Sequence, residues 1–203
     1  MPAGLRRGRP ARRALLASLL TSTLAIAQTP PKPTAKKTTT HRANELTLAG
    51  LRPGRDRLDR AVHRYRDYHK NDPTDSAHDA QTTWLDPCRK QLLAIDFDAE
   101  KKIQVVRAGA VNLTADCLAV PPSPWKTGHG LRLGDPAARV AQLYGEPDSR
   151  SPSTKDGQPL ELWYYAFDWA GPDVPQVMEV LCTKEQDGQP GRVEEITLAA
   201  PSL

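Results

Sequence analysis

The sequence lacks a long apolar run. Its most apolar stretch covers residues 14–27, and a helix of that length spans about 21 Å, which is short of the roughly 30 Å hydrocarbon core of a bilayer. No cysteine directly follows this stretch, so a lipid anchor would have no sulfur atom for its attachment. Both absences argue against permanent attachment to a membrane.

The sequence also lacks the short motifs on which common catalytic sites depend. It contains no H-E-x-x-H, G-x-S-x-G, Walker A or C-x-x-C pattern. The glycines of residues 128–134 superficially resemble a dinucleotide fingerprint, but the last one comes a position late and no hydrophobic strand precedes it. We therefore predict a protein that is not an enzyme, with no catalytic residue, cofactor or metal ligand.

Few histidines and acids stand at the spacing that metal ligands need. The alternative hypothesis rests on these few residues. His63 and His69 lie near Asp59 and Asp67, but a separation of six residues does not bring two ligands onto one helix face. The rival is a small exported metal-binding protein or enzyme that uses these surface histidines and aspartates. Elemental analysis of the purified protein distinguishes the two hypotheses.

Positive charge is concentrated at the N-terminus. Five arginines and no acid precede the apolar stretch, which ends in Ala25-Ile26-Ala27. This order of charged region, apolar region and A-x-A site predicts a removable signal peptide over residues 1–27. The mature protein is then periplasmic or secreted, with no stable membrane span after cleavage. The pair Arg12-Arg13 leaves the choice between general and twin-arginine export open.

The net charge of +4 belongs to the N-terminal segments. Residues 28–44, rich in Pro, Lys and Thr, hold four more positive charges and no acid, so residues 45–203 carry 19 basic and 24 acidic side chains. No general electrostatic attraction to nucleic acid is therefore expected. Residues 28–44 are predicted to be a disordered linker, and a structural protein tethered to the envelope by this linker is a third hypothesis.

Two segments of the remaining chain match at an offset of 79 residues. The matched pairs are Asp56 with Asp135, Arg60 with Arg139, Tyr65 with Tyr144, and Trp84 with Trp163. In each segment a helical apolar period is followed by strand-like alternation. The pattern predicts an α+β fold of two tandem units, residues 45–120 and 121–203, each with a helical segment packed on a short antiparallel β-meander.

The elements of these units have recognisable starts and stops. Asp56 is the expected cap of a helix that stops at Asn71-Asp72-Pro73, and Asp135 caps a second helix that Gly145 ends. The predicted strands cover residues 90–98, 102–107, 160–169, 176–184 and 192–199.

The second unit contains three short motifs: Leu131-Arg132-Leu133-Gly134-Asp135, Leu143-Tyr144-Gly145-Glu146-Pro147 and Trp163-Tyr164-Tyr165. They resemble the SmpA/OmlA (BamE-like) family of small envelope proteins, in which a Gly-x-Pro turn after a helical pair precedes a three-stranded sheet. Tandem copies of a similar unit build the secreted β-lactamase-inhibitor proteins, which bind another protein. The first unit has Arg66-Asp67-Tyr68 in place of the Gly-x-Pro turn. The resemblance implies two BamE-like units and an envelope-associated or protein-binding function.

Three cysteines permit one disulfide and leave one thiol. Cys182 alternates in phase with Met178 and Val180, which favours a buried free cysteine. Cys88 and Cys117 flank the predicted hairpin of the first unit, and a bridge between them closes a loop of about 30 residues. This is the favoured pairing, with Cys88 to Cys182 as the alternative.

Aromatic residues supply the candidate contacts with a partner. Trp163, Tyr165, Phe167 and Trp169 fall on one side of a predicted strand. Trp169 stands at the strand end, where we expect it to be half covered and to offer the best binding anchor. Trp163, Tyr164 and Trp84 are the further candidate partner-binding residues.

The sequence thus predicts an exported, non-enzymatic module that acts through contacts with an unidentified protein. One charged segment leaves a question open. Residues 52–70 carry six arginines and a lysine, with three aspartates interleaved. A solvated, partly ion-paired face is favoured, and a docking face for an acidic partner is the alternative.

Overall fold

The computed structural model describes residues 42, 44–71, 80–113, 117, 120, 122–185, 188 and 190–201, all within one compact unit. The predicted signal peptide and most of the predicted linker lie outside these residues. In chain order the elements are α1 (Leu58–Arg64), β1 (His69–Asn71), β2 (Gln81–Asp86), β3 (Gln91–Phe97), β4 (Ile103–Ala110), α2 (Ala137–Tyr144), β5 (Ser149–Lys155), β6 (Gln158–Ala166), β7 (Val177–Thr183) and β8 (Val193–Ala199).

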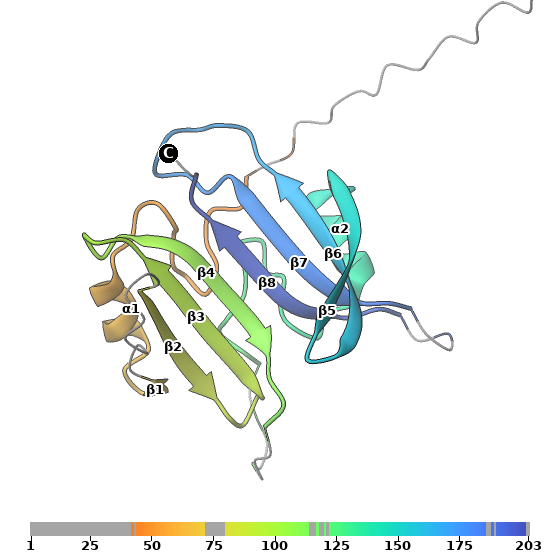
Figure 1. Cartoon of the computed structure of the whole chain (residues 1–203), viewed down its shortest axis with the longest axis horizontal. Helices are drawn as coiled ribbons and strands as arrows, with labels where there is room; N and C mark the ends of the chain where they lie inside the picture. Colours follow the sequence, from red (N-terminus) through yellow and green to blue (C-terminus); the bar gives the residue numbers. More distant parts are fainter. Residues whose placement is uncertain are drawn as a thin grey trace, which may run out of the picture. The chain divides into compact units, whose positions relative to one another are not determined.

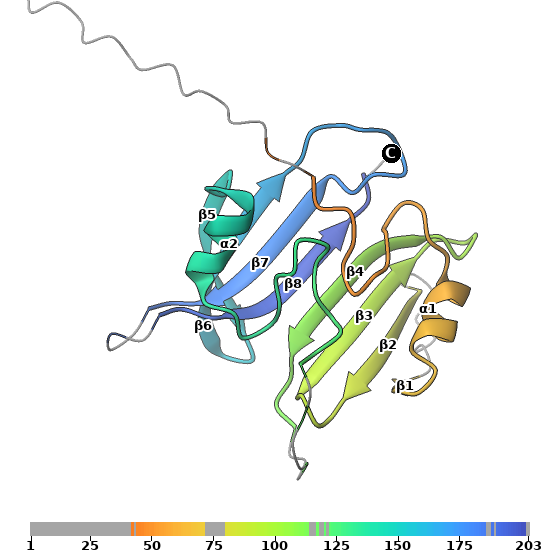
Figure 2. The same ribbon diagram turned by 180° about the vertical axis from the view of Figure 1, so that it is seen from behind.

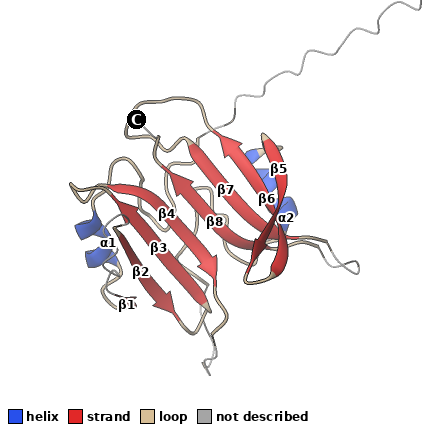
Figure 3. Ribbon diagram, viewed as in Figure 1, coloured by secondary structure: helices blue, strands red, loops and turns tan. Residues whose placement is uncertain are grey.

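The eight described strands form one antiparallel sheet, in the order β1-β2-β3-β4-β8-β7-β6-β5 (Figures 1 and 3). Neighbouring strands are also consecutive in the chain except at the centre, where β4 pairs with β8. In that pairing Val105 lies opposite Ala199 and Gly109 lies opposite Glu195. The sheet is therefore continuous from β1 to β5.

This continuous sheet contradicts the predicted α+β fold of two tandem helix-plus-meander units. The described chain is mostly β, with two short helices. Alternating apolar residues identify strands, but they do not say which strand edges pair across a long separation. The two units were expected to be separate because nothing in the pattern of either one predicts the β4–β8 ladder. The BamE-like resemblance and the tandem repeat, which implied separate units, are wrong on the same ground.

The helices lie on one face of the sheet. Figure 2 shows α1, α2 and residues 44–57 and 122–136 in front of the strands, while Figure 1 shows no described segment across the opposite face. Side chains alternate between these faces. The buried set facing the helices includes Trp84, Leu93, Ile95, Val106, Met178, Val180, Ile196 and Leu198. The opposite, open face carries half-buried side chains, among them Leu92, Arg107 and Leu181.

Both helices begin one residue later than predicted. Their N-caps are Arg57 and Pro136, and neither has a side-chain cap. Asp56 instead accepts a hydrogen bond from the amide of Arg52, and Asp135 accepts one from the amide of Arg132. Each carboxylate therefore closes the turn before its helix rather than the helix itself.

The ends of the helices differ in how well the sequence predicts them. Gly145 ends α2 with a φ of 73°, as its freedom at positive φ suggests. Helix α1 is much shorter than predicted, because it ends at Arg64 and residues 69–71 form β1.

Five strands lie close to their predicted positions, and three strands were missed. Strand β7 alternates half-buried and buried side chains without a break, and β3, β4, β6 and β8 each contribute several buried side chains. Strand β5, with the sequence SRSPSTK, is almost wholly exposed at the sheet edge, so it has no buried face to produce an apolar signal. Strand β1 has only three residues, and β2 was also missed.

The structure contains the disulfide that the spacing favoured. Cys88 and Cys117 are bonded, with their Cα atoms 5.6 Å apart, and Cys182 is a buried free cysteine. Burial raises the pKa of the Cys182 thiol to about 12, so this side chain packs as a small apolar group. Among the described residues, no helix is long and apolar enough to cross a membrane.

Gly191 offers a direct test of the packing between α2 and the β7–β8 connection. Its carbonyl accepts the amide of Ala137 at 2.7 Å, and an added Cβ would overlap the backbone carbonyl oxygen of Thr183. Gly191→Ala should lower the free energy of unfolding by about 1–3 kcal/mol, because backbone cannot move aside as a flexible side chain can. Urea unfolding followed by tryptophan fluorescence measures this change.

Gly109→Ala is the matched control. Its Cβ would meet the movable ends of Lys155 and Glu195, at 2.9 and 3.1 Å. It should destabilise the protein less than Gly191→Ala, and equal effects would contradict the predicted packing.

Candidate functional site

Trp169 leaves the aromatic row that the sequence predicts. Trp163, Tyr165 and Phe167 are buried against the helical face, whereas 57% of Trp169 is exposed. Strand β6 ends at Ala166, so the residues beyond it no longer follow the strand's alternation. We name residues 167–176, which connect β6 to β7, the Trp169 loop.

Hydrogen bonds close the base of the Trp169 loop. The amide of Phe167 donates to the carbonyl of Gln176 at 2.7 Å, and the amide of Gln176 donates to Ala199 on β8 at 3.1 Å. Within the loop, the amide of Val174 donates to Gly171 at 3.2 Å. The loop is therefore continuous with the β6–β7–β8 ladder.

Side chains that precede the loop by more than seventy residues hold it in place. Asn44 Nδ2 donates to the carbonyl of Asp168 at 2.8 Å. Arg52 Nε donates to the carbonyl of Asp173 at 2.8 Å, and Lys102 Nζ lies 3.3 Å from the Asp173 carboxylate. Contacts on both sides of Trp169 thus fix the loop while the indole remains exposed.

Arg42 joins the end of β6 to the end of α2. Its guanidinium donates to the carbonyl of Tyr144 at 2.9 Å and to Asp148 Oδ2 at 2.6 Å. It also donates to the Glu146 carbonyl and lies 4.8 Å from the centre of the Tyr165 ring. Arg42 and Asn44 were predicted to belong to a disordered linker, and the structure places both in the folded unit.

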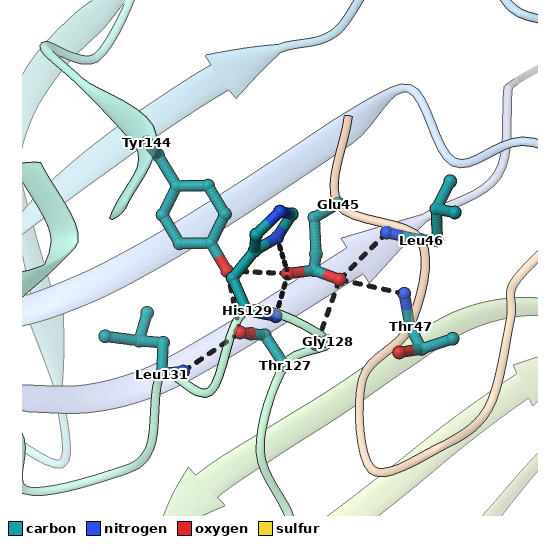
Figure 4. A network of polar contacts seen from close by, with 8 residues as sticks. All are labelled: Glu45, Leu46, Thr47, Thr127, Gly128, His129, Leu131 and Tyr144. Atoms are coloured by element: carbon teal, nitrogen blue, oxygen red, sulfur yellow. Dashed lines mark hydrogen bonds and ion pairs between the residues drawn. The ribbon is translucent and has the colours of Figure 1, made fainter. Parts of the chain in front are cut away.

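Glu45 lies at the centre of a buried polar network (Figure 4). Its fully buried carboxylate accepts the amides of Leu46 at 2.8 Å, Thr47 at 3.0 Å and Gly128 at 3.0 Å on Oε1. On Oε2 it accepts the amide and Nδ1 of His129, at 3.1 and 2.8 Å, and the hydroxyl of Tyr144 at 2.7 Å. The network fastens residues 45–47 to the loop before α2 and to α2 itself.

These bonds set the protonation state of Glu45. Burial alone would raise its pKa, but hydrogen bonds from the backbone of Thr47, from Tyr144 and from His129 outweigh burial and lower the pKa below its usual 4.5. Burial, followed by the negative charge of Glu45, raises the pKa of Tyr144 far above its usual value. An ionised carboxylate whose two oxygens each accept three donors has no free lone pair with which to remove a proton from a substrate.

The candidate partner-binding residues fare differently. Trp84 and Trp163 are buried in the core, 1% and 6% exposed, so neither indole lies at the surface of the folded protein. Tyr164 precedes the buried Tyr165 on β6, so its side chain points to the open face of the sheet, where it is half-buried. Trp169 alone of the four combines wide exposure with a loop position.

The side chains of the metal hypothesis that the structure describes are His63, Asp59 and Asp67. His63 and Asp59 line one groove beside α1, while Asp67 lies 3.7 Å from Arg66. Among the described residues, no group of three or more His, Cys, Asp or Glu side chains is placed to hold a metal ion.

Arg42 and Glu45 were not predicted to be functional or structural centres. Their partners lie roughly a hundred residues away along the chain, and no local spacing reports such contacts. A charged residue at the boundary of a polar segment gave no signal that it is buried.

No family model matches this chain, and no curated protein matches it either. Among solved structures, the chain is similar to a cysteine-rich secretory protein from Staphylococcus aureus, with 10% identity and a TM-score of 0.38. The match covers 79% of this chain and 48% of the other, so the chain spans about half the length of that protein. A similarity this low carries no argument about fold or function.

Replacing Glu45 by Gln should expose the contribution of the Glu45 network to stability. Glu45→Gln keeps the shape but removes the charge and one acceptor oxygen, and should lower the free energy of unfolding at pH 7 by about 1–3 kcal/mol. Since the folded-state pKa is lowered, the stabilisation is complete above pH 4.5 and is lost as pH falls through the folded value. The difference between the two proteins should therefore shrink below pH 4.5.

Urea unfolding at a series of pH values measures this difference. Glu146→Gln is the control, because the Glu146 side chain is 80% exposed and pairs only with Arg150. A Glu45→Gln protein as stable as the wild type at pH 7 would contradict the role assigned to the network.

Proposed function

We propose that this chain is an exported, non-enzymatic protein that acts by binding another protein, with Trp169 as the central contact. The observation that supports the proposal is the combination of an indole that is 57% exposed with a backbone fixed on both sides of it. An exposed indole offers a partner a large, rigid apolar surface together with one N–H donor. Tryptophan is also strongly enriched among the residues that dominate binding energies.

The fixed loop lowers the entropy that binding must overcome. Asn44 and Arg52 hold the backbone carbonyls of Asp168 and Asp173, and Lys102 pairs with the Asp173 carboxylate, before any partner arrives. Ordering a mobile segment at an interface opposes binding, whereas a loop ordered in advance avoids that loss. Such a loop suits a pre-formed interface in which one indole enters a pocket of the partner.

Two features support export. The arginine-rich start, apolar stretch and A-x-A site have the order of a signal peptide. The Cys88–Cys117 bond is of a kind that persists in oxidising compartments and is rare where thiols are kept reduced. The proposed site of action is therefore the periplasm or the medium.

The absence of catalysis is part of the proposal. The most deeply buried carboxylate, Glu45, has its oxygens occupied by six donors. Its Oε2 lies 2.8 Å from Nδ1 of His129. This acid–histidine pair serves to hold backbone amides in place, which favours a structural role over proton transfer.

The test uses a photoreactive aromatic amino acid at position 169 in the exporting cell. We expect a discrete cross-linked protein from position 169 and none from position 154, where Thr154 is exposed on β5. The cross-linked protein, once purified, should bind the Trp169→Ala variant about thirtyfold more weakly than the wild type, as expected for a residue at the centre of an interface.

The Trp169→Phe variant should retain part of the affinity, because it keeps an aromatic ring in the same loop. Both variants should unfold at the temperature of the wild type, since the indole contributes little to the core. Equal cross-linking from both positions, or unchanged affinity after Trp169→Ala, would contradict the proposal.

A further inference from the structure

A groove of about 710 Å³ runs along the outer side of α1. It is lined by Arg57, Leu58, Asp59, Val62, His63, Arg66 and Lys101. The turn between β3 and β4 forms its other wall, because the carbonyl of Lys101 accepts the amide of Leu58 at 2.8 Å. Figure 2 shows α1 beside that turn, away from β5 to β8 and α2.

The floor of the groove is apolar. Val62 lies one helical turn from Leu58, and 37% of it is exposed. The aliphatic stems of Arg57 and Arg66 extend this apolar surface while their charged ends stay in water. The ammonium group of Lys101 lies 4.6 Å from the centre of the Phe97 ring. Leu58 is the only lining residue that is even half-buried, so the groove is an open trough and not an enclosed cavity.

The rim of the groove is positively charged. Arg57, Arg66 and Lys101 face one acid, Asp59, although residues 45–203 as a whole carry more acidic than basic side chains. Arg57 and Lys101 form no ion pair with any described residue. The one partner of Arg66, Asp67, lies 3.7 Å away, with both side chains mostly exposed. Exposed pairs of this kind contribute little energy and can be exchanged for a stronger partner.

We propose that this groove binds an acidic segment of a partner protein, one that places an aliphatic side chain on Val62 and carboxylates against Arg57, Arg66 and Lys101. Charge complementarity selects the acidic partner, since a positive rim attracts carboxylates and repels basic chains. The apolar floor requires that the segment also carry an aliphatic side chain. This site is separate from the Trp169 loop and does not depend on it.

The openness of the trough favours a protein segment over a free anionic amphiphile. Small ligands bind in concavities that bury most of their surface, and six of the seven lining residues here are exposed. A segment that belongs to a folded partner needs no enclosure, because the partner orders it and covers its other side. Fatty acids and free phosphate are therefore the alternatives that the experiment must exclude.

The experiment titrates the mature protein with defined peptides and follows backbone amide shifts by NMR. The first probe is an acetylated ten-residue peptide with Glu on both sides of a central Leu-Leu pair. Matched peptides replace Glu by Gln, or Leu by Ser. We expect the acidic Leu peptide to shift the amides of Val62, His63 and Lys101, and each matched peptide to bind about tenfold more weakly.

Charge reversal locates the site. Arg57→Glu combined with Arg66→Glu should weaken binding of the acidic peptide at least tenfold. Lys126→Glu combined with Lys184→Glu makes the same change in net charge at exposed positions outside the groove and should leave affinity within about twofold. Circular dichroism establishes that each variant is folded.

Every other outcome overturns the proposal. Shifts confined to the groove with dodecanoate but not with the peptide would assign it to an anionic amphiphile, and shifts with inorganic phosphate alone would assign it to a simple anion. Peptide binding that the control variant weakens as much as Arg57→Glu with Arg66→Glu would show a nonspecific charge effect. Because Trp169→Ala leaves this groove intact, failure here is distinguishable from failure of the Trp169 interface.

Discussion

The pairing of β4 with β8 is the constraint on which the rest of the structure depends. It joins strands from the two halves of the chain, and without it both would present a row of unpaired backbone groups at a sheet edge. The ladder sets Val106 beside Leu198 and Ala108 beside Ile196, so the two halves share a core. Residues 44–57 then pass over the joined strands (Figure 2), and their contacts reach from α2 to the Trp169 loop.

How far the sequence predicts this fold depends on the range of each interaction. Strands β6, β7 and β8 were recognised because apolar side chains alternate along them, and Gly145 marks the end of α2 because its φ is positive. The β4–β8 ladder has no such local mark, and its absence from the prediction led to two units instead of one sheet. Strand β5 was missed for a different reason: an exposed edge strand can be wholly polar, so its sequence has no apolar alternation.

In the candidate site, too, a residue with a local signal was predicted, and residues defined by long-range contacts were not. Trp169 was found because a large aromatic side chain at the end of an apolar strand is unusual by itself. The residues that hold its loop were not found, because Asn44 and Arg52 act on carbonyl groups more than a hundred positions away. Glu45 shows the same limit most clearly, since a single carboxylate collects donors from three separate segments. Backbone amides and carbonyls, which every residue carries, leave no trace in composition or spacing.

The two outer strands have a consequence for how the protein behaves at high concentration. An unpaired strand edge is a template for strands from other molecules, and the outer strands of the described sheet are β1 and β5. Here β1 offers only three residues, and β5 carries Pro152, which has no amide hydrogen to donate. Both borders are therefore poor templates for a ninth strand. The molecule can keep one side of its sheet in water without stacking edge to edge into fibres.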